Sequence, residues 1–201
     1  MQKPRDKYCR SATPLYHPGE DHSLVYLVVE GYVVLDCNSP DGRECIVALL
    51  SPGDYFGPGL TGEPTNHRAL AKPGCRLQVE SRESFRQHLS AEPQRALTLA
   101  SQLARREARL QHLLYLEHTA ELPRRLAWLL QELFNECGDS CHHGHQRDIK
   151  LSQQELAAMA GGSRQTVSQL LNDWRRAGII AYTRHYLCLE NPQLLKQLMP
   201  D

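Results

Sequence analysis

A pair of glycines, Gly161 and Gly162, separates two short amphipathic segments and constrains the fold more than any other feature. Ser152 and Glu155, in the first segment, have the S-x-x-E spacing of a capping box, which predicts the start of a helix. The glycines supply the permissive backbone that a sharp turn needs. Ser163 follows at once and can cap a second helix. The sequence therefore predicts two helices joined by a tight turn.

The second predicted helix has two unlike faces. Apolar residues recur from Val167 to Trp174 at the i, i+3, i+4, i+7 spacing of a buried helix face. The opposite stripe consists of Arg164, Gln165, Ser168, Gln169 and Asn172. Arginine pairs with guanine edges, while glutamine and asparagine pair with adenine edges, so this stripe suits the major groove of DNA. An ordinary helical hairpin with a solvated polar face would show the same pattern.

The residues that follow favour DNA binding over an ordinary hairpin. Two β-rich runs, 179–182 and 186–189, flank a polar turn and predict a hairpin, which beside two such helices would be a wing. The stretch ELAAMAGGSRQTVSQLLNDWRRAGII, residues 155–180, resembles the winged-helix signature of the CRP/FNR family of transcription regulators. The resemblance implies a sequence-specific regulator that contacts DNA through Gln153, Ser163, Arg164, Gln165, Thr166, Ser168, Gln169 and Arg184.

The resemblance also assigns roles within that set. Arg164 matches the arginine that reads a guanine, and Ser163 and Thr166 match phosphate contacts. Gln165 and Gln169 stand where members often carry Glu and Arg, which read the inner base pairs. We therefore expect a half-site that differs from TGTGA at its inner positions, with adenine favoured by the glutamines.

The N-terminal half is rich in short β-runs separated by turn residues. Runs are predicted at 25–29, 32–37, 45–50, 55–57, 68–71 and 75–80. Regularly spaced short strands predict an antiparallel sandwich or barrel. The succession PGE, YLVVEGYVVL, DGRE, SPGDYFG resembles the cyclic-nucleotide-binding β-roll of the same family. The expected fold class is thus α+β.

In nucleotide-binding members this β-roll carries a phosphate cassette, F-G-E followed ten residues after the Glu by Arg-Ser/Thr. Phe56 and Gly57 are in place and Arg68 falls at the matching distance, but Pro58 replaces the Glu and Ala69 the hydroxyl residue. Losing both groups should cost several kcal/mol, at roughly 1.5–3 kcal/mol for each charged hydrogen bond. We therefore expect no cAMP binding in the usual mode. Arg68 either binds another anion or has a structural role.

A long helix is predicted from about residue 92 to 117. It carries a leucine stripe, which suits either core packing or a two-fold coiled-coil seam. The stripe is Leu99, Leu103, Leu110 and Leu114. In the family this helix is the dimer interface, and its adenine-contacting positions correspond to Leu110 and Gln111, a half-lost polar pair. Gly57, Arg68 and Gln111 are the candidate effector-pocket residues that the resemblance implies.

A further helix is predicted from Arg124 to Glu136, with an inner face formed by Leu126, Leu129, Leu130 and Leu133. The loop after it gathers two cysteines and three histidines: Cys137, Cys141, His142, His143 and His145. Such a set could bind zinc or sense redox state, although the spacing matches no standard structural-zinc pattern. A solvated loop is the alternative, and no resident cofactor is otherwise expected.

Composition restricts the remaining choices. The net charge is zero and the pI about 7.1, so DNA affinity must come from locally placed arginines rather than from a global positive field. The polar N-terminus is no signal peptide, and the longest apolar run is too short to span a membrane, so we expect a cytoplasmic protein. No G-x-S-x-G, P-loop or dinucleotide motif is present, and His17, His22 and His67 form no cupin-type ligand set, so no enzyme is expected.

Together these features predict a β-roll at 1–89, a dimerisation helix at 90–118 and a winged-helix domain at 119–201. The expected function is a homodimeric transcription regulator, an activator by resemblance, on palindromic double-stranded DNA, with RNA polymerase as an implied partner. We expect it to act without cAMP. Either an unidentified ligand or metal shifts the dimer between active and inactive forms, or the dimer is permanently competent and is controlled by its abundance, which the degraded cassette favours. The alternative is a regulator that senses a metal or redox state through the Cys137–His145 loop.

Overall fold

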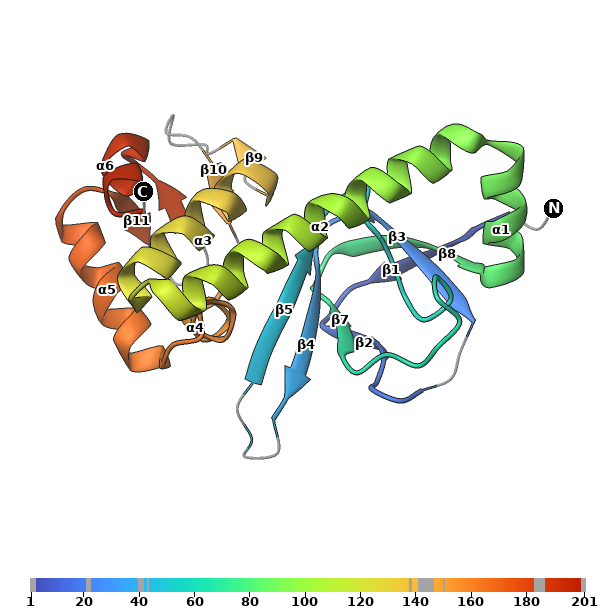
Figure 1. The fold of residues 1–201 in the computed structure, drawn as a ribbon, viewed down its shortest axis with the longest axis horizontal. Helices are drawn as coiled ribbons and strands as arrows, with labels where there is room; N and C mark the ends of the chain where they lie inside the picture. The colour runs from blue at the N-terminus through green and yellow to red at the C-terminus, as the bar shows by residue number, and fades with distance from the viewer. Residues whose placement is uncertain are drawn as a thin grey trace. The chain divides into compact units, whose positions relative to one another are not determined.

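The computed structural model describes residues 3–20, 23–39, 42, 44–137, 139–140, 147–149, 151–182 and 187–199. The chain divides into two compact units, residues 1–109 and 110–201 (Figure 1). The helix that passes from one unit into the other, α2, contributes residues to both. Within the described residues, no helix is long and apolar enough to cross a membrane.

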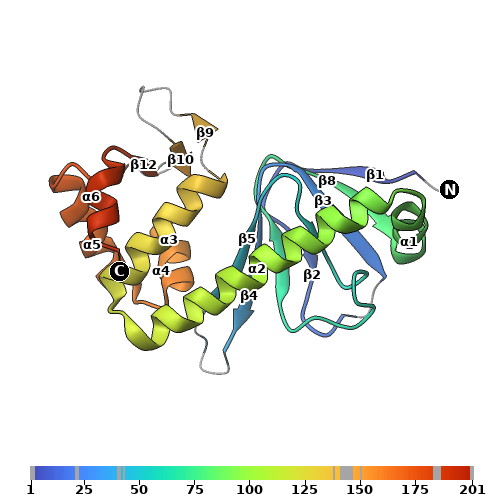
Figure 2. The same cartoon turned by 45° about the horizontal axis from the view of Figure 1, so that its top comes forward.

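Two four-stranded antiparallel sheets form the first unit (Figures 1 and 2). The sheet order β1-β8-β3-β6 joins β1 (Arg5–Cys9), β8 (Cys75–Ser81), β3 (Leu24–Glu30) and β6 (Tyr55–Phe56). The sheet order β2-β7-β4-β5 joins β2 (Thr13–Tyr16), β7 (Arg68–Ala71), β4 (Val33–Asn38) and β5 (Glu44–Leu50). Their facing side chains make one apolar core, which confirms the predicted antiparallel β-roll.

The six strands expected from the sequence are present, but β1 and β2 were not expected. Four of the five β1 side chains are exposed and only Cys9 is buried. Because β1 is held by its backbone pairing with β8 rather than by buried side chains, its sequence shows no alternation of apolar and polar residues. The missed strand therefore lies at the edge of its sheet.

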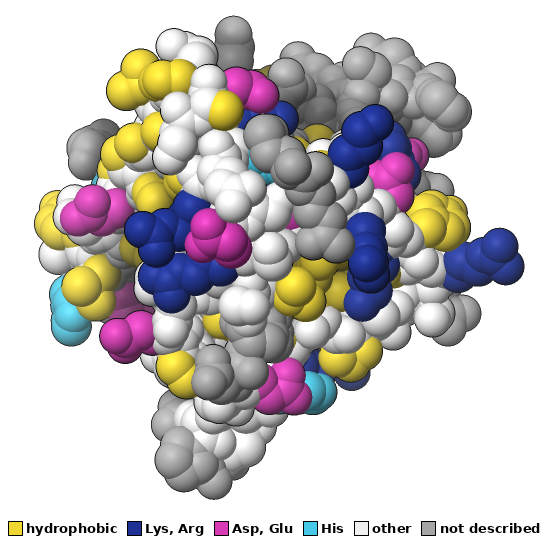
Figure 3. All heavy atoms as spheres, turned by 90° about the vertical axis from the view of Figure 1, so that its right-hand side faces the viewer, with side chains coloured by type: hydrophobic (Ala, Val, Ile, Leu, Met, Phe, Trp, Pro, Cys, Tyr) yellow, Lys and Arg dark blue, Asp and Glu magenta, His cyan; other side chains and the backbone are white. Residues whose placement is uncertain are grey.

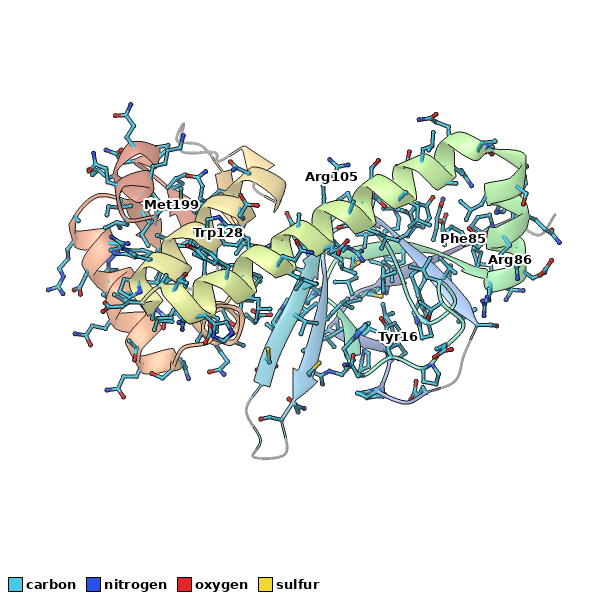
Figure 4. The ribbon with its side chains drawn as sticks, viewed as in Figure 1. Tyr16, Phe85, Arg86, Arg105, Trp128 and Met199 are labelled. Atoms are coloured by element: carbon cyan, nitrogen blue, oxygen red, sulfur yellow. The ribbon has the colours of Figure 1, made fainter. Side chains whose placement is uncertain are left out.

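Helix α1 (Arg82–Ala91) begins after Ser81, whose hydroxyl accepts a hydrogen bond from the amide of Ser84. Phe85 is buried and its ring lies 5.3 Å from that of Tyr55, so it fixes α1 on the roll (Figure 4). Figure 3 looks onto the α1 end of this unit and shows acidic and basic side chains interspersed. The described side chains of that face therefore form no patch of a single charge sign.

Helix α2 (Pro93–Thr119) matches the predicted long helix. Its first half is tied to the roll, since Gln102 donates to the carbonyl of Gly53 and Arg106 donates to that of Tyr55 at 2.7 Å. Leu116 is the one residue of α2 that is fully buried. Most of this 27-residue helix is therefore uncovered by the chain itself.

The second unit contains α3 (Leu122–Cys137), α4 (Gln153–Ala160), α5 (Arg164–Arg176) and α6 (Pro192–Gln197). Its sheet has the order β11-β12-β10-β9, with β9 (Asp139–Ser140), β10 (Arg147–Ile149), β11 (Ile180–Tyr182) and β12 (Leu187–Leu189). The predicted inner face of α3 is confirmed, because its four leucines are completely buried: Leu126, Leu129, Leu130 and Leu133. The predicted wing is the β11–β12 hairpin.

The interpretation of the segment after α3 as an irregular loop needs correction. Cys137 is the last residue of α3, and β9 pairs with β10 in an antiparallel hairpin that joins the wing sheet. Two- and three-residue strands are too short to show periodicity in the sequence, so the hairpin could not be recognised there. Cys141, His142, His143 and His145 lie outside the described residues.

Candidate nucleic-acid interface

Side-chain caps define where α4 and α5 begin. The Ser152 hydroxyl accepts from the amide of Glu155 at 3.2 Å, while the Glu155 carboxylate accepts from the amide of Ser152 at 2.9 Å. This reciprocal pair is the predicted capping box. Gly161 then adopts a φ of 67°, in the left-handed region that favours glycine. Ser163 caps α5 by accepting from the amide of Thr166 at 3.1 Å, so the predicted turn between the helices is confirmed.

The other end of α5 is fixed equally well by its backbone. Gly178 has a φ of 68°, its amide donates to the carbonyl of Arg175 at 3.1 Å, and the amide of Ile179 donates to that of Trp174 at 2.9 Å. These two bonds form a Schellman motif, which satisfies carbonyls that a helix end leaves open. Trp174 and Val167 are buried on the inner side. The helix is thus held at both ends with one face inward.

The outward face of α5 presents the polar side chains that the sequence singled out. Arg164, Gln165 and Gln169 are exposed, and Ser168 and Asn172 are half-buried. A shallow depression gathers them with one residue of α4 and one more of α5, and we call it the recognition surface: Gln153, Arg164, Gln165, Ser168, Gln169, Asn172 and Arg176. Five of the predicted DNA contacts therefore lie together on one surface.

Three further predicted contacts lie elsewhere. Ser163 and Thr166 are at the N-terminal end of α5, where their hydroxyl oxygens are 2.8 Å apart. Both side chains are exposed beside the first amides of the helix, and such a helix end attracts phosphate groups. Arg184 falls between β11 and β12 in the sequence, outside the described residues.

Arg125 on α3 positions the turn between α4 and α5, a role that no motif in the sequence indicates. Its guanidinium donates to the carbonyls of Ala160 at 3.2 Å, Gly161 at 3.3 Å and Ala120 at 3.2 Å. It also pairs with the Glu117 carboxylate at 3.2 Å, and its side chain is 14% exposed. The carbonyls of Ala160 and Gly161 are 35 and 36 residues away along the chain, so only the fold reveals the contact. Arg125 anchors the end of α4 against α3.

The leucine stripe on α2 is largely uncovered. Leu103 is 44% exposed, Leu110 50% and Leu114 61%, while Leu99 is half-buried. Large apolar side chains exposed along one helix commonly mark an interface with another protein chain. This exposure fits a seam between two copies of the chain better than packing within one copy.

The interior of the β-roll holds an aromatic cluster that the sequence analysis did not foresee. Tyr26 and Phe56 stack with ring centroids 5.1 Å apart, and Tyr16, which lies inside the roll (Figure 4), has its hydroxyl 3.1 Å from Nε2 of His67. Burial raises the pKa of Tyr16 above its usual value and that of Tyr26 to about 12. Burial, and to a smaller extent Arg106, lowers the pKa of His67. The tyrosine and histidine side chains of the cluster are therefore neutral at neutral pH, and Arg106 is a cation whose charge acts on Tyr16 and His67.

The candidate effector residues have separate surroundings. Nε and Nη2 of Arg68 donate to the Asp36 carboxylate at 2.8–3.2 Å, and Asp36 is only 2% exposed. Gly57 has a φ of 113°, and a Cβ there would lie 2.8 Å from the carbonyl oxygen of Leu24. Gln111 is exposed on the part of α2 that belongs to the second unit. Arg68 thus has a structural partner that the sequence could not reveal, because Asp36 is on a neighbouring strand.

The Cys137–His145 group remains a prediction. The side chain of Cys137 and all of Cys141, His142, His143 and His145 are outside the described parts of the chain. Among the residues that are described, no cluster of three or more His, Cys, Asp or Glu side chains is arranged to hold a metal ion.

Comparisons with known proteins agree with this geometry. Residues 7–92 match the family profile of a cyclic nucleotide-binding domain, and residues 124–198 match a Crp-like helix-turn-helix domain. The chain is 31% identical over 172 residues to the cAMP-activated global transcriptional regulator CRP of Pasteurella multocida (strain Pm70), covering 80% of this chain and 78% of that protein.

Solved structures show the same fold along nearly the whole chain. FixK2 from Bradyrhizobium japonicum superposes with a TM-score of 0.82 at 24% identity, covering 98% of each chain. A CRP-family transcriptional regulator from Thermus thermophilus superposes with a TM-score of 0.80 at 26% identity, covering 96% of this chain and 95% of that chain. Both units of the present chain therefore have counterparts in these proteins.

Proposed function

The chain belongs to the CRP/FNR family of DNA-binding transcription regulators, and we propose that it binds palindromic promoter DNA as a homodimer without requiring cAMP. Members of this family bind DNA, act as dimers and are regulators rather than enzymes. The observation that carries the proposal is the recognition surface, where base-reading side chains cluster on the exposed face of a doubly capped helix.

The side-chain chemistry of the recognition surface supports assigning its residues to different bases. We assign Arg164 to a guanine, because its two N–H groups can donate together to O6 and N7. Gln165 and Gln169 can each donate to N7 and accept from N6 of an adenine. Ser168 adds a hydroxyl that suits either base. This assignment gives the half-site one strongly read guanine next to positions where adenine is favoured.

Phosphate contacts would orient α5 in the groove. Ser163 and Thr166 stand at its N-terminal end, where free amides and the helix dipole attract anions. Gln153, at the start of α4, belongs to the adjoining recognition surface. We assign Arg184 in the wing turn to a neighbouring phosphate. Phosphate contacts of this kind fix position without reading sequence.

Dimerisation through α2 would place two such helices on one palindrome. Fully burying a leucine side chain stabilises by about 1.5–3 kcal/mol, so covering the stripe in a two-fold seam is strongly favourable. The stripe consists of Leu99, Leu103, Leu110 and Leu114. Two recognition helices in successive major grooves would then read half-sites about one helical turn apart.

The proposal that the protein acts without cAMP is based on the residues of the β-roll. The relative from Pasteurella multocida is a cAMP-activated regulator, but here Arg68 is paired with buried Asp36, and Pro58 and Ala69 replace two cassette residues. The aromatic side chains supply no replacement cation, and the nearby Arg106 donates to the carbonyl of Tyr55. We therefore propose a dimer that is competent without an obligate effector. Promoter activation through contact with RNA polymerase is proposed from the family likeness.

The test is a binding titration with the purified chain. A DNA site is first selected from a random pool, and its Kd is then measured by fluorescence anisotropy at fixed salt with and without cAMP. We expect tight specific binding by the protein alone and no change in Kd when cAMP is added. Specific binding that appears only with cAMP would contradict the effector-independent dimer while leaving the DNA-binding role intact.

The dimer seam has its own test. Leu110→Lys should convert the dimer to a monomer in sedimentation experiments and weaken binding to a palindrome far more than binding to a half-site. Leu97→Lys is the matched control, because Leu97 is 61% exposed on the same helix but lies on a different face. Equal effects of the two substitutions would sink the assignment of the leucine stripe.

A further inference from the structure

Four of the seven cysteines face one another in two cross-strand pairs. Cys37 of β4 lies directly opposite Cys45 of β5, and Cys9 of β1 lies directly opposite Cys75 of β8. Directly opposed residues of antiparallel strands have Cα atoms about 4.5–5.5 Å apart, within the range of about 4.4–6.8 Å that disulfides span. The backbone therefore brings both pairs to bonding range, although all four are free thiols in this structure.

The two pairs differ in their access to solvent. Cys45 is exposed and Cys37 is half-buried, whereas Cys9 and Cys75 are both buried. The sheet order β2-β7-β4-β5 makes β5 an edge strand, so among the described residues no further strand pairs with β5 beyond Cys45 (Figures 1 and 2). A dissolved oxidant can reach the first pair and not the second.

The pKa values of the buried cysteines also make the Cys9–Cys75 pair the less reactive of the two. Burial raises the pKa of Cys75 to about 12, with further contributions from Cys9 and Glu30. Burial also raises the pKa of the Cys37 thiol, and the nearby Cys45 and Asp36 add to the effect. Since Cys45 is the one exposed thiol of the four, it is the thiol through which exchange with a dissolved disulfide would begin.

We propose that Cys37 and Cys45 form a redox-active thiol pair that low-molecular-weight disulfides oxidise to a cross-strand disulfide. The proposal does not depend on DNA binding, and it involves none of the residues in the Cys137–His145 segment. It assigns a modification site to the β4–β5 hairpin of the β-roll.

The reaction proceeds by two exchanges. The Cys45 thiolate attacks one sulfur of oxidised glutathione, forms a mixed disulfide and releases one glutathione thiolate. The Cys37 thiol, which donates weakly to the carbonyl of Asn66 at 3.5 Å, loses its proton and attacks Sγ of Cys45. The second glutathione thiolate leaves. Two cysteine thiols are oxidised, one glutathione disulfide is reduced to two thiols, and the two cysteine protons end on glutathione.

The test uses the full chain and separates all four cysteines by proteolysis. The reduced protein is incubated with mixtures of reduced and oxidised glutathione, quenched with acid, denatured and alkylated. Trypsin then places each cysteine in its own peptide, because Arg10, Arg43 and Arg68 lie between them in sequence. We expect a Cys37–Cys45 linked peptide pair that grows with oxidised glutathione and disappears with dithiothreitol. Cys9 and Cys75 should stay alkylated throughout.

Variants make the result specific. Cys37→Ser should abolish the link and stop the reaction at a glutathione adduct on Cys45. Cys188→Ser, in β12 of the second unit, should leave the link unchanged. Circular dichroism checks that each variant folds. A Cys45 adduct without any link in the wild-type chain overturns the proposal. Oxidation of Cys9 and Cys75 before Cys37 and Cys45 overturns it as well.

Discussion

Each unit has one candidate ligand-binding arginine, Arg68 in the first and Arg164 in the second, and the two have opposite surroundings. In the β-roll, Arg68 sits at the family's phosphate-binding position but is paired with buried Asp36. In the winged-helix unit, Arg164 is exposed on the recognition surface and makes no hydrogen bond or ion pair with any described residue. An arginine already satisfied within the protein has little to offer a ligand, whereas one left to solvent can bind its target at small cost. The candidate DNA-contacting arginine of the second unit is thus accessible to a ligand, whereas the candidate effector arginine of the first unit is already paired.

The same contrast extends to the surrounding side chains. The roll interior is closed by neutral aromatic rings such as those of Tyr16 and Tyr26. The recognition surface instead gathers amide and hydroxyl groups that need partners. Since the whole chain has no net charge, we expect its DNA affinity to depend on this local arrangement rather than on general electrostatic attraction.

The largest effect should come from breaking the internal pair of the roll. Arg68→Met leaves the Asp36 carboxylate buried without its partner, which should lower the free energy of unfolding of the first unit by about 3–5 kcal/mol. Hydrogen exchange of peptides from β4 and β7 measures the loss. The Kd for selected DNA should stay unchanged for protein that remains folded.

Arg76→Met is the control for that substitution. Arg76 pairs with Glu30 at 3.5 Å on the surface, with both side chains more than 40% exposed, and such pairs contribute about 0–1 kcal/mol. If Arg68→Met left the roll as stable as the control did and altered DNA binding instead, Arg68 would be an effector contact and the contrast between the units would fail.

A smaller loss of stability is expected when the turn between α4 and α5 loses the side chain that holds it. Arg125→Met removes a guanidinium that serves three carbonyls and Glu117, which should cost about 2–3 kcal/mol. Both tryptophans, Trp128 and Trp174, lie in the second unit, so tryptophan fluorescence during urea unfolding follows that unit alone. The first unit should unfold as before.

The neighbouring Arg124 offers a matched control, because it is exposed on the same helix. Arg124→Met should leave the urea midpoint nearly unchanged, since exposed substitutions usually change stability by less than about 0.5 kcal/mol. A midpoint that shifted equally in both variants would mean that Arg125 has no special part in holding α4.

Arg68 and Arg125 also show where sequence reasoning reaches its limit. The start of α4 at Ser152, the turn at Gly161 and the cap at Ser163 follow from residues within four positions of one another, and all were predicted correctly. Arg68 and Asp36 are 32 residues apart, and Arg125 and Ala160 are 35 apart. Such pairs form only because the fold brings distant segments together, and no local pattern records them.

Solvent-exposed side chains are a second reason why some structural features could not be predicted from the sequence. The strand β1 was missed because four of its five side chains face solvent, so it lacks an apolar signature. The leucine stripe of α2 was recognised, but its sequence allowed either core packing or a seam. Exposure of Leu110 and Leu114 in the folded chain favours the seam. The polar face of α5 was identified because a helix with one apolar and one polar face has a strong period.

The smallest expected effect concerns Arg164, the exposed member of the two arginines compared above. Arg164→Ala removes a guanidinium that has no structural partner among the described residues, so the urea midpoint should not move. Affinity for the selected site should fall by about 1–3 kcal/mol, with specificity relaxed at one base pair. Arg175→Ala is the control, because Arg175 is exposed on the last turn of α5 outside the recognition surface. Anisotropy titrations on the selected site, on each single-base variant and on random DNA separate the outcomes. A loss for Arg164→Ala that is equal on all of these would mean that Arg164 contacts the phosphate backbone, because a base contact must discriminate whereas a phosphate contact cannot.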